Sequence, residues 1–147
     1  MNEPSTLTDQ EVDFLRRAIA IAAQSRADGH APYGSLLVDA DGTVLAEDHN
    51  TTRADHDITA HPELKLARWA ARELDAATVA GTTLYTSCQP CGMCAGAIDR
   101  SGLGRVVYAF SNQQFAALDP GGVFGSVPQV GPALNAEARA VLEGYPD

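Results

Sequence analysis

The stretch TTLYTSCQPCGMCAGAIDRSGLGRVVYAF, residues 82–110, carries the strongest evidence about the fold class. Alternation around Leu84 predicts a strand over 82–86, and a helix is expected over 91–101. Residues 105–110, which contain Val106 and Val107, predict another strand. A strand, a helix and a strand in this order favour a parallel pair of strands connected through the helix.

The residues before and after this stretch supply the other expected elements. Thr8 and Glu11 have the spacing of a capping box, and apolar residues then recur at helical spacing, which predicts a helix over 9–27. Strands over 33–38 and 44–47 flank the turn sequence DADG and predict a hairpin. Further helices are predicted over 60–74 and 134–144. The apolar face expected for the helix over 60–74 consists of Leu64, Ala67, Ala71 and Leu74.

This order of elements predicts an α/β fold in which helices cover both faces of one sheet, as a three-layer α/β/α sandwich. The chain has 147 residues, of which 45% are hydrophobic, so we expect one compact domain over 1–147. No apolar run reaches the about 18 residues of a membrane span, and the N-terminus is not a secretory signal, so a cytoplasmic protein is expected. The net charge of −9 disfavours binding to nucleic acid and favours a small, neutral substrate.

Two short motifs predict a metal site, namely HPE at 61–63 and PCGMC at 90–94. His61, Cys91 and Cys94 offer the nitrogen and sulfur ligands that zinc prefers. Three protein ligands leave a fourth position open for water, which is the pattern of catalytic zinc. Glu63 follows His61 by two residues, so we expect it to take a proton from that water and pass it to a substrate.

The cysteines also allow two other interpretations. A Cys-x-x-Cys pair taken alone is typical of a redox site. Cys88 could also join His61, Cys91 and Cys94 in a closed Cys₃His site, and Glu63 would then have no role. We expect instead that Cys88 ends the strand and does not bind the metal.

Together the two motifs match the His-x-Glu and Pro-Cys-x-x-Cys signature of zinc base deaminases. The chain resembles the cytidine and deoxycytidylate deaminase superfamily, within it the branch of guanine deaminases, yeast-type cytosine deaminases and tRNA adenosine deaminases. The run PYG at 32–34 is similar to a Pro-Phe-Gly of guanine-deaminase-like members. The resemblance implies a mixed five-stranded sheet between helices and a homodimer with active sites near the interface. Pro62 and Gln89 depart from the usual Ala and Glu of the family.

The resemblance also guides the expected substrate site. Asn50 stands where relatives place an asparagine that hydrogen-bonds the base, and Ala60 belongs to the run Asp57-x-Thr59-Ala60-His61, which resembles the branch's Asp-Pro-Thr-Ala-His. Three aromatic residues are candidates to stack on a flat ring, with ordinary core packing as the alternative. These aromatic candidates are Tyr33, Phe110 and Phe124.

The expected activity is zinc-dependent hydrolytic deamination of a free nucleobase or a related amino-substituted heterocycle. Guanine is the first expected substrate because of the PYG run and the acidic charge, and cytosine or an amino-substituted triazine would use the same groups. A tRNA adenosine deaminase is the nearest rival, and it would need a basic surface to hold an RNA loop. A non-catalytic zinc module with the closed Cys₃His site is the second rival.

Overall fold

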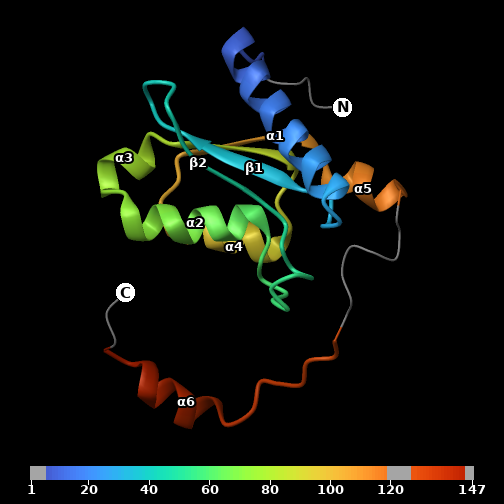
Figure 1. Ribbon diagram of the computed structural model, residues 1–147. Helices are drawn as coiled ribbons and strands as arrows, with labels where there is room; N and C mark the ends of the chain where they lie inside the picture. Colours follow the sequence, from blue (N-terminus) through green and yellow to red (C-terminus); the bar gives the residue numbers. More distant parts are fainter. Residues whose placement is uncertain (1–5, 119–126, 145–147) are drawn as a thin grey trace.

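The computed structural model describes residues 6–118 and 127–144, and its strands form one sheet in the order β2-β1-β3-β4 (Figure 1). The strands are β1 (Gly34–Val38), β2 (Val44–His49), β3 (Thr83–Cys88) and β4 (Arg105–Phe110). β1 pairs in an antiparallel sense with β2 and β3, whereas β3 and β4 are parallel. The sheet is therefore mixed, and the parallel step predicted for residues 82–110 is confirmed.

Helices cover both faces of this sheet, which confirms the three-layer α/β/α architecture. α1 (Asp9–Ala27) lies on one face, and α2 (Pro62–Glu73) and α4 (Gly92–Ser101) lie on the other (Figure 1). The buried core on the α1 side contains Ala18, Leu36, Val38, Tyr85 and Val107. The buried core on the α2 and α4 side contains Leu37, Leu66, Ala67, Ala70, Val79, Leu84 and Ile98. Because side chains alternate along a strand, Ser35 shares the α2 face of β1 with Leu37.

α1 begins at the predicted capping box and packs closely on β1. The Oγ1 atom of Thr8 accepts a hydrogen bond from the Glu11 backbone N–H at 3.1 Å, and the Glu11 carboxylate accepts one from Thr8 at 3.2 Å. Gly34 permits the close approach, because a Cβ there would lie 2.6 Å from the backbone nitrogen of Ala22 and 2.7 Å from the carbonyl oxygen of Ala18. Any side chain at residue 34 would therefore push α1 away from the sheet.

The expected fifth strand is wrong for the described residues, whose sheet has the four strands above. After β4 the chain enters a helix, α5 (Asn112–Leu118), in place of another strand. Ser111 and Gln114 explain why a helix begins here. The Gln114 N–H donates to Ser111 Oγ at 3.0 Å, and the Ser111 N–H donates to Gln114 Oε1 at 2.8 Å. This reciprocal capping box starts a helix, so β4 remains at the edge of the sheet.

The predicted apolar face of α2 is confirmed at Ala67 but is otherwise displaced by about one residue. The residues that α2 buries are Pro62, Glu63, Leu66, Ala67 and Ala70. Ala71 is exposed, and Leu64 and the C-cap residue Leu74 are only partly buried. The hydrophobic pattern misplaced the face because the buried stripe includes a carboxylate, Glu63, which a search for apolar side chains passes over.

Two further helices lie at the periphery. α3 (Ala76–Ala80) was not predicted, and Asp75 starts it by accepting a hydrogen bond from the Thr78 N–H at 2.7 Å. α6 (Asn135–Leu142) confirms the helix predicted near the C-terminus, and each of its residues is exposed. Within residues 6–118 and 127–144, no helix is long and apolar enough to cross a membrane.

Candidate active site

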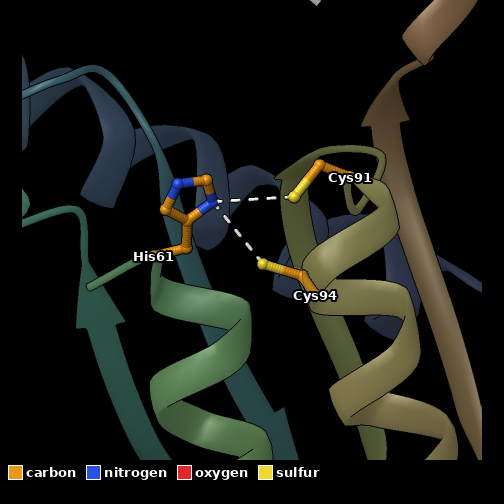
Figure 2. Close-up of side chains that lie close together, drawn as sticks. All are labelled: His61, Cys91 and Cys94. Atoms are coloured by element: carbon orange, nitrogen blue, oxygen red, sulfur yellow. Dashed lines mark hydrogen bonds between the residues drawn. The ribbon is translucent and has the colours of Figure 1, made fainter. Parts of the chain in front are cut away.

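His61, Cys91 and Cys94 come together from two helices, as the two motifs predicted (Figure 2). The Nδ1 atom of His61 lies 3.5 Å from the sulfur of Cys94 and 3.8 Å from that of Cys91. All three potential ligand atoms lie within 4.8 Å of one another. Tetrahedral zinc, with bonds of about 2.0–2.1 Å to nitrogen and about 2.3 Å to sulfur, would place nitrogen and sulfur about 3.6 Å apart. The donor set and its spacing therefore fit zinc, with Nδ1 as the histidine ligand.

The local sequence explains why these three side chains meet. His61 is the N-cap of α2 and Cys91 is the N-cap of α4, and neither side chain makes a capping hydrogen bond. Pro62 occupies the first turn of α2, where the missing N–H costs no hydrogen bond. Cys94 lies in the first turn of α4, three residues after Cys91. Both helix N-termini thus point toward the site, and their positive dipole ends favour thiolates.

The electrostatics of the two thiols differ because they share a hydrogen bond. That contact, followed by one with His61, lowers the pKa of Cys91 to about 3. The same contact and burial raise the pKa of Cys94. The contact with Cys91 also raises the pKa of His61. A metal cation bound between the three groups would favour the deprotonated form of both thiols, so Cys91 and Cys94 would no longer share a proton. Such loss of protons is expected of residues that bind a metal.

Glu63 is buried beside this cluster, with 6% of its surface exposed. Its Oε1 atom accepts hydrogen bonds from Ser35 Oγ at 3.2 Å and from Thr86 Oγ1 at 3.1 Å. Burial raises the pKa of the carboxyl group, and hydrogen bonds from Cys94, Thr86 and Ser35 oppose that shift. Ser35 and Thr86 were not predicted as site residues. Each is a polar residue within an otherwise buried strand, and that pattern in the sequence could have indicated their role.

A cavity of about 420 Å³ opens beside the ligands. Five predicted site residues line it: Tyr33, Asn50, His61, Glu63 and Cys91. Three other predicted residues do not line it in the described part of the chain: Ala60 is a buried core residue, the metal-ligand candidate Cys94 is fully buried, and Phe110 ends β4. Phe124, the remaining candidate, lies outside the described residues.

Asn50 is held in one orientation at the cavity wall. Its Oδ1 atom accepts hydrogen bonds from the Thr52 backbone N–H at 3.0 Å and from Thr52 Oγ1 at 2.9 Å. The backbone N–H of Thr52 can only donate, so its partner must be the amide oxygen, and the amide cannot be flipped. The Nδ2 group makes no hydrogen bond to the described residues and is left as a donor at the cavity.

The cavity wall also contains residues that the sequence analysis did not place there. Phe115 of α5 lies across from Tyr33, with their ring centroids 6.4 Å apart. The other lining residues that were not predicted as site residues are Ala31, Thr52, Arg53, Pro62, Cys88, Gln89 and Asn112. Phe115 and Asn112 could have been found through the Ser111-x-x-Gln114 capping signal, which brings α5 back over the site.

Cys88 is separate from the group of potential metal ligands. It ends β3, as expected, and it lines the cavity as a half-buried free thiol. Burial raises its pKa, and the nearby Glu63 carboxylate adds to that effect. The metal-ligand group consists of His61, Cys91 and Cys94 without Cys88, so the closed Cys₃His alternative has no support in this geometry.

Comparison with known families places this site in context. Residues 8–110 match the family model of the cytidine and deoxycytidylate deaminase zinc-binding region. The chain is 35% identical over 115 residues to a probable cytosine deaminase of Schizosaccharomyces pombe, across 76% of this chain and 67% of that protein. It is 33% identical over 119 residues to a tRNA-specific adenosine deaminase of Agrobacterium fabrum, across 81% of this chain and 78% of that one.

A third relative is much longer than this chain. The chain is 33% identical over 154 residues to a tRNA(Ile)-lysidine synthase of Deinococcus deserti, and the match spans 99% of this chain but 28% of that protein. Among solved structures, guanine deaminase from Bacillus subtilis superposes with a TM-score of 0.70 at 26% identity, across 96% of this chain and 97% of that one. The match of the zinc-binding region over residues 8–110 shows that the chain belongs to the cytidine and deoxycytidylate deaminase family of zinc-dependent hydrolytic deaminases.

Proposed function

We propose that this chain removes the amino group of a free nucleobase or a related flat heterocycle by hydrolysis. One observation carries the proposal: the buried carboxylate of Glu63 lines the same cavity as His61 and Cys91, two of the three residues that fit a zinc site. The cavity of about 420 Å³ is large enough for a flat heterocycle and falls in the usual range for small-molecule sites.

His61, Cys91 and Cys94 would hold the metal. When bound, zinc acts as a Lewis acid that acidifies a water molecule near neutral pH. The Glu63 carboxylate would take one proton from the attacking water and give it to a ring nitrogen, and it would then carry the second proton, from the new hydroxyl group on the ring, to the departing amine. A C–O bond forms and the C–N bond breaks, so that one water is consumed and ammonia leaves while the ring gains a carbonyl.

Residues at the cavity wall would hold the ring. The Nδ2 group of Asn50 is available to donate to a ring acceptor, since Thr52 fixes the amide. Tyr33, which immediately precedes β1, and Phe115 of α5 both offer aromatic surface for stacking on a planar substrate. These contacts orient the ring so that its amino-bearing carbon faces the metal ligands and Glu63.

Guanine is the first substrate we propose. The PYG run at 32–34, the net charge of −9 and the similarity to guanine deaminase from Bacillus subtilis support this choice. Cytosine is the next candidate, because the probable cytosine deaminase of Schizosaccharomyces pombe is 35% identical over 115 residues. An amino-substituted triazine would present a ring of similar shape.

Deamination of adenosine in tRNA is the second candidate function. The tRNA-specific adenosine deaminase of Agrobacterium fabrum, 33% identical over 119 residues, favours it. The acidic net charge of −9 weighs against a long RNA contact, because phosphate binding needs lysine and arginine side chains.

Ammonia release distinguishes these substrates. The zinc-loaded protein is incubated with guanine, cytosine, an amino-substituted triazine and tRNA, and ammonia is measured over time. We expect turnover of a free base and none of tRNA. Release from tRNA alone would replace the first proposal by the second, and release from no member of the panel would contradict both.

We also propose a cytoplasmic homodimer, as the family resemblance implies. The three cysteines are all free, which suits a reducing compartment. Light scattering on the purified protein measures its mass: a value of twice the chain's 15.4 kDa supports the dimer, and a value equal to one chain contradicts it.

A further inference from the structure

We propose that Asn112 is a positioning residue: it anchors α5 to the segment that leads into the metal-ligand candidate Cys91, and thereby holds the Phe115 ring at the cavity. This inference rests on the proposed function, because a stacking ring matters only for a flat substrate. Asn112 and Phe115 both belong to α5 and both line the cavity. They are three residues apart, so they lie on the same face of the helix.

α5 is too short to hold its own position. It has seven residues, and none of the seven is buried. An isolated helix of fewer than about 12–15 residues is marginal in water, and helices in proteins gain most of their stability from packing of a buried face. The capping hydrogen bonds between Ser111 and Gln114 start the helix, but they lie within its own first turn and do not attach it to the sheet. A contact with another element is therefore needed to keep α5 beside the cavity.

Asn112 supplies such a contact through two hydrogen bonds to the residues just before Cys91. Its backbone N–H donates to Gln89 Oε1 at 2.9 Å, and its Nδ2 donates to the Pro90 carbonyl oxygen at 3.1 Å. A backbone carbonyl oxygen can only accept, so the amide nitrogen must face Pro90 and the side chain has one orientation. The Gln89 N–H also donates to the Phe110 carbonyl oxygen at 2.7 Å. The start of α5 is thus tied to the segment that carries a potential metal ligand.

The aromatic wall of the cavity depends on this anchor. The rings of Phe115 and Tyr33 have centroids 6.4 Å apart and planes at 48° to each other, and both residues line the cavity. Tyr33 immediately precedes β1 and is held by the sheet, whereas the place of Phe115 follows that of α5. If the Asn112 side chain releases Pro90, α5 shifts and the Phe115 ring withdraws, so a bound heterocycle loses stacking surface.

Two variants remove the side-chain contact and keep the backbone hydrogen bond: Asn112→Ala and Asn112→Asp. Neither change weakens the helix itself, since alanine has a higher helix propensity than asparagine and aspartate is favoured in the first turn. Gln113→Ala is the matched control, because it also removes an amide from α5, at an exposed residue that does not line the cavity. If Asn112→Ala does not fold, Asn112→Asp provides the same comparison.

Kinetics separate a positioning role from a general loss of stability. Ammonia release from the base that the wild type deaminates best gives kcat and KM for the zinc-loaded proteins. We expect both Asn112 variants to raise KM about three- to tenfold, the effect of one lost hydrogen bond, with kcat and zinc content unchanged. Gln113→Ala should match the wild type. An unchanged KM in Asn112→Ala would overturn the inference, and so would loss of zinc, because Asn112 would then act on the metal ligands and not on the aromatic wall.

A double variant tests whether the effect passes through Phe115. Phe115→Ala should itself raise KM, and the addition of Asn112→Ala should raise it little further. Two independent effects that multiply would overturn the route through Phe115.

Amide hydrogen exchange tests the anchor without a substrate. Residues 112–118 should exchange faster in Asn112→Ala than in the wild type or in Gln113→Ala, and equal exchange would overturn the inference. A wild type that releases ammonia from no base would overturn the proposed function and leave the exchange result standing, so the two failures are distinct.

Discussion

Ser35 and Thr86 face each other across the β1–β3 register, and their hydroxyl oxygens lie 2.8 Å apart. Both hydroxyl groups also lie within hydrogen-bonding distance of Glu63 Oε1. Each hydroxyl has one proton to donate, so Ser35 donates either to Glu63 directly or to Thr86, which in turn donates to Glu63. The sheet thereby fixes the carboxylate that we propose as the proton carrier.

Removing the Thr86 hydroxyl should impair this positioning without removing the metal. In Thr86→Val we expect kcat to fall about tenfold, since one hydrogen bond to a charged group is lost, while KM and zinc content change little. Thr86→Ser, which keeps the hydroxyl, should restore most of the rate. Thr83→Val is the control, because Thr83 is on the same strand and is not among the described hydrogen-bond partners of Glu63. An unchanged kcat in Thr86→Val would show that the hydroxyl does not position the carboxylate.

Zinc binding should depend on Cys94 and not on Cys88. We expect Cys94→Ser to lose zinc and Cys88→Ser to retain one zinc per chain, because Cys88 lies outside the cluster of ligand atoms. Metal content is measured by atomic emission after dialysis. Loss of zinc in Cys88→Ser would instead revive the closed Cys₃His site.

Chelation should also lower the thermal stability of the folded chain. A ligand that binds the native state at about 1,000 times its Kd stabilises that state by about 4 kcal/mol. We therefore expect a chelator to lower Tm by several degrees in the wild type and to have little effect on Cys94→Ser. Equal shifts in the two proteins would contradict a zinc site that includes Cys94.

Gly34 should be required for the packing of α1 on β1. A Cβ at this residue would lie 2.6 Å from a backbone atom of α1, which cannot move alone, so we expect Gly34→Ala to lower the free energy of unfolding by about 1–3 kcal/mol. Gly92→Ala is the control, since a Cβ at Gly92 would meet no atom within 4 Å. Denaturant melts of the zinc-loaded proteins measure both. A stable Gly34→Ala variant would contradict the close approach.

The parts of the structure that depend on local sequence were predictable. The capping box at Thr8 and the crossover over residues 82–110 depend on neighbours along the chain, and both are confirmed. The metal cluster was also predictable, because His61 and Cys91 each begin a helix whose start signal is local. The strand count was wrong because it came from the family resemblance. The residues themselves had indicated the four strands found in the described region.

The partners of the catalytic groups could not be predicted in the same way. Ser35 and Thr86 meet Glu63 only after β1, β3 and α2 have packed together. A buried carboxylate also shifts the apparent apolar face of a helix, as it did for α2. Phe115 was missed because the cavity wall depends on how α5 folds back after β4.

The central claim is that Glu63 moves protons at an open zinc site. Glu63→Gln tests it most directly, because the amide oxygen can still accept hydrogen bonds from Ser35 and Thr86 but cannot take a proton. Zinc content and kcat/KM for the best base are measured together, with Glu73→Gln at the exposed end of α2 as the control. We predict unchanged zinc in both variants, full activity in Glu73→Gln, and a loss of about 10²–10⁴-fold in Glu63→Gln. A zinc-loaded Glu63→Gln variant with wild-type activity would contradict the account.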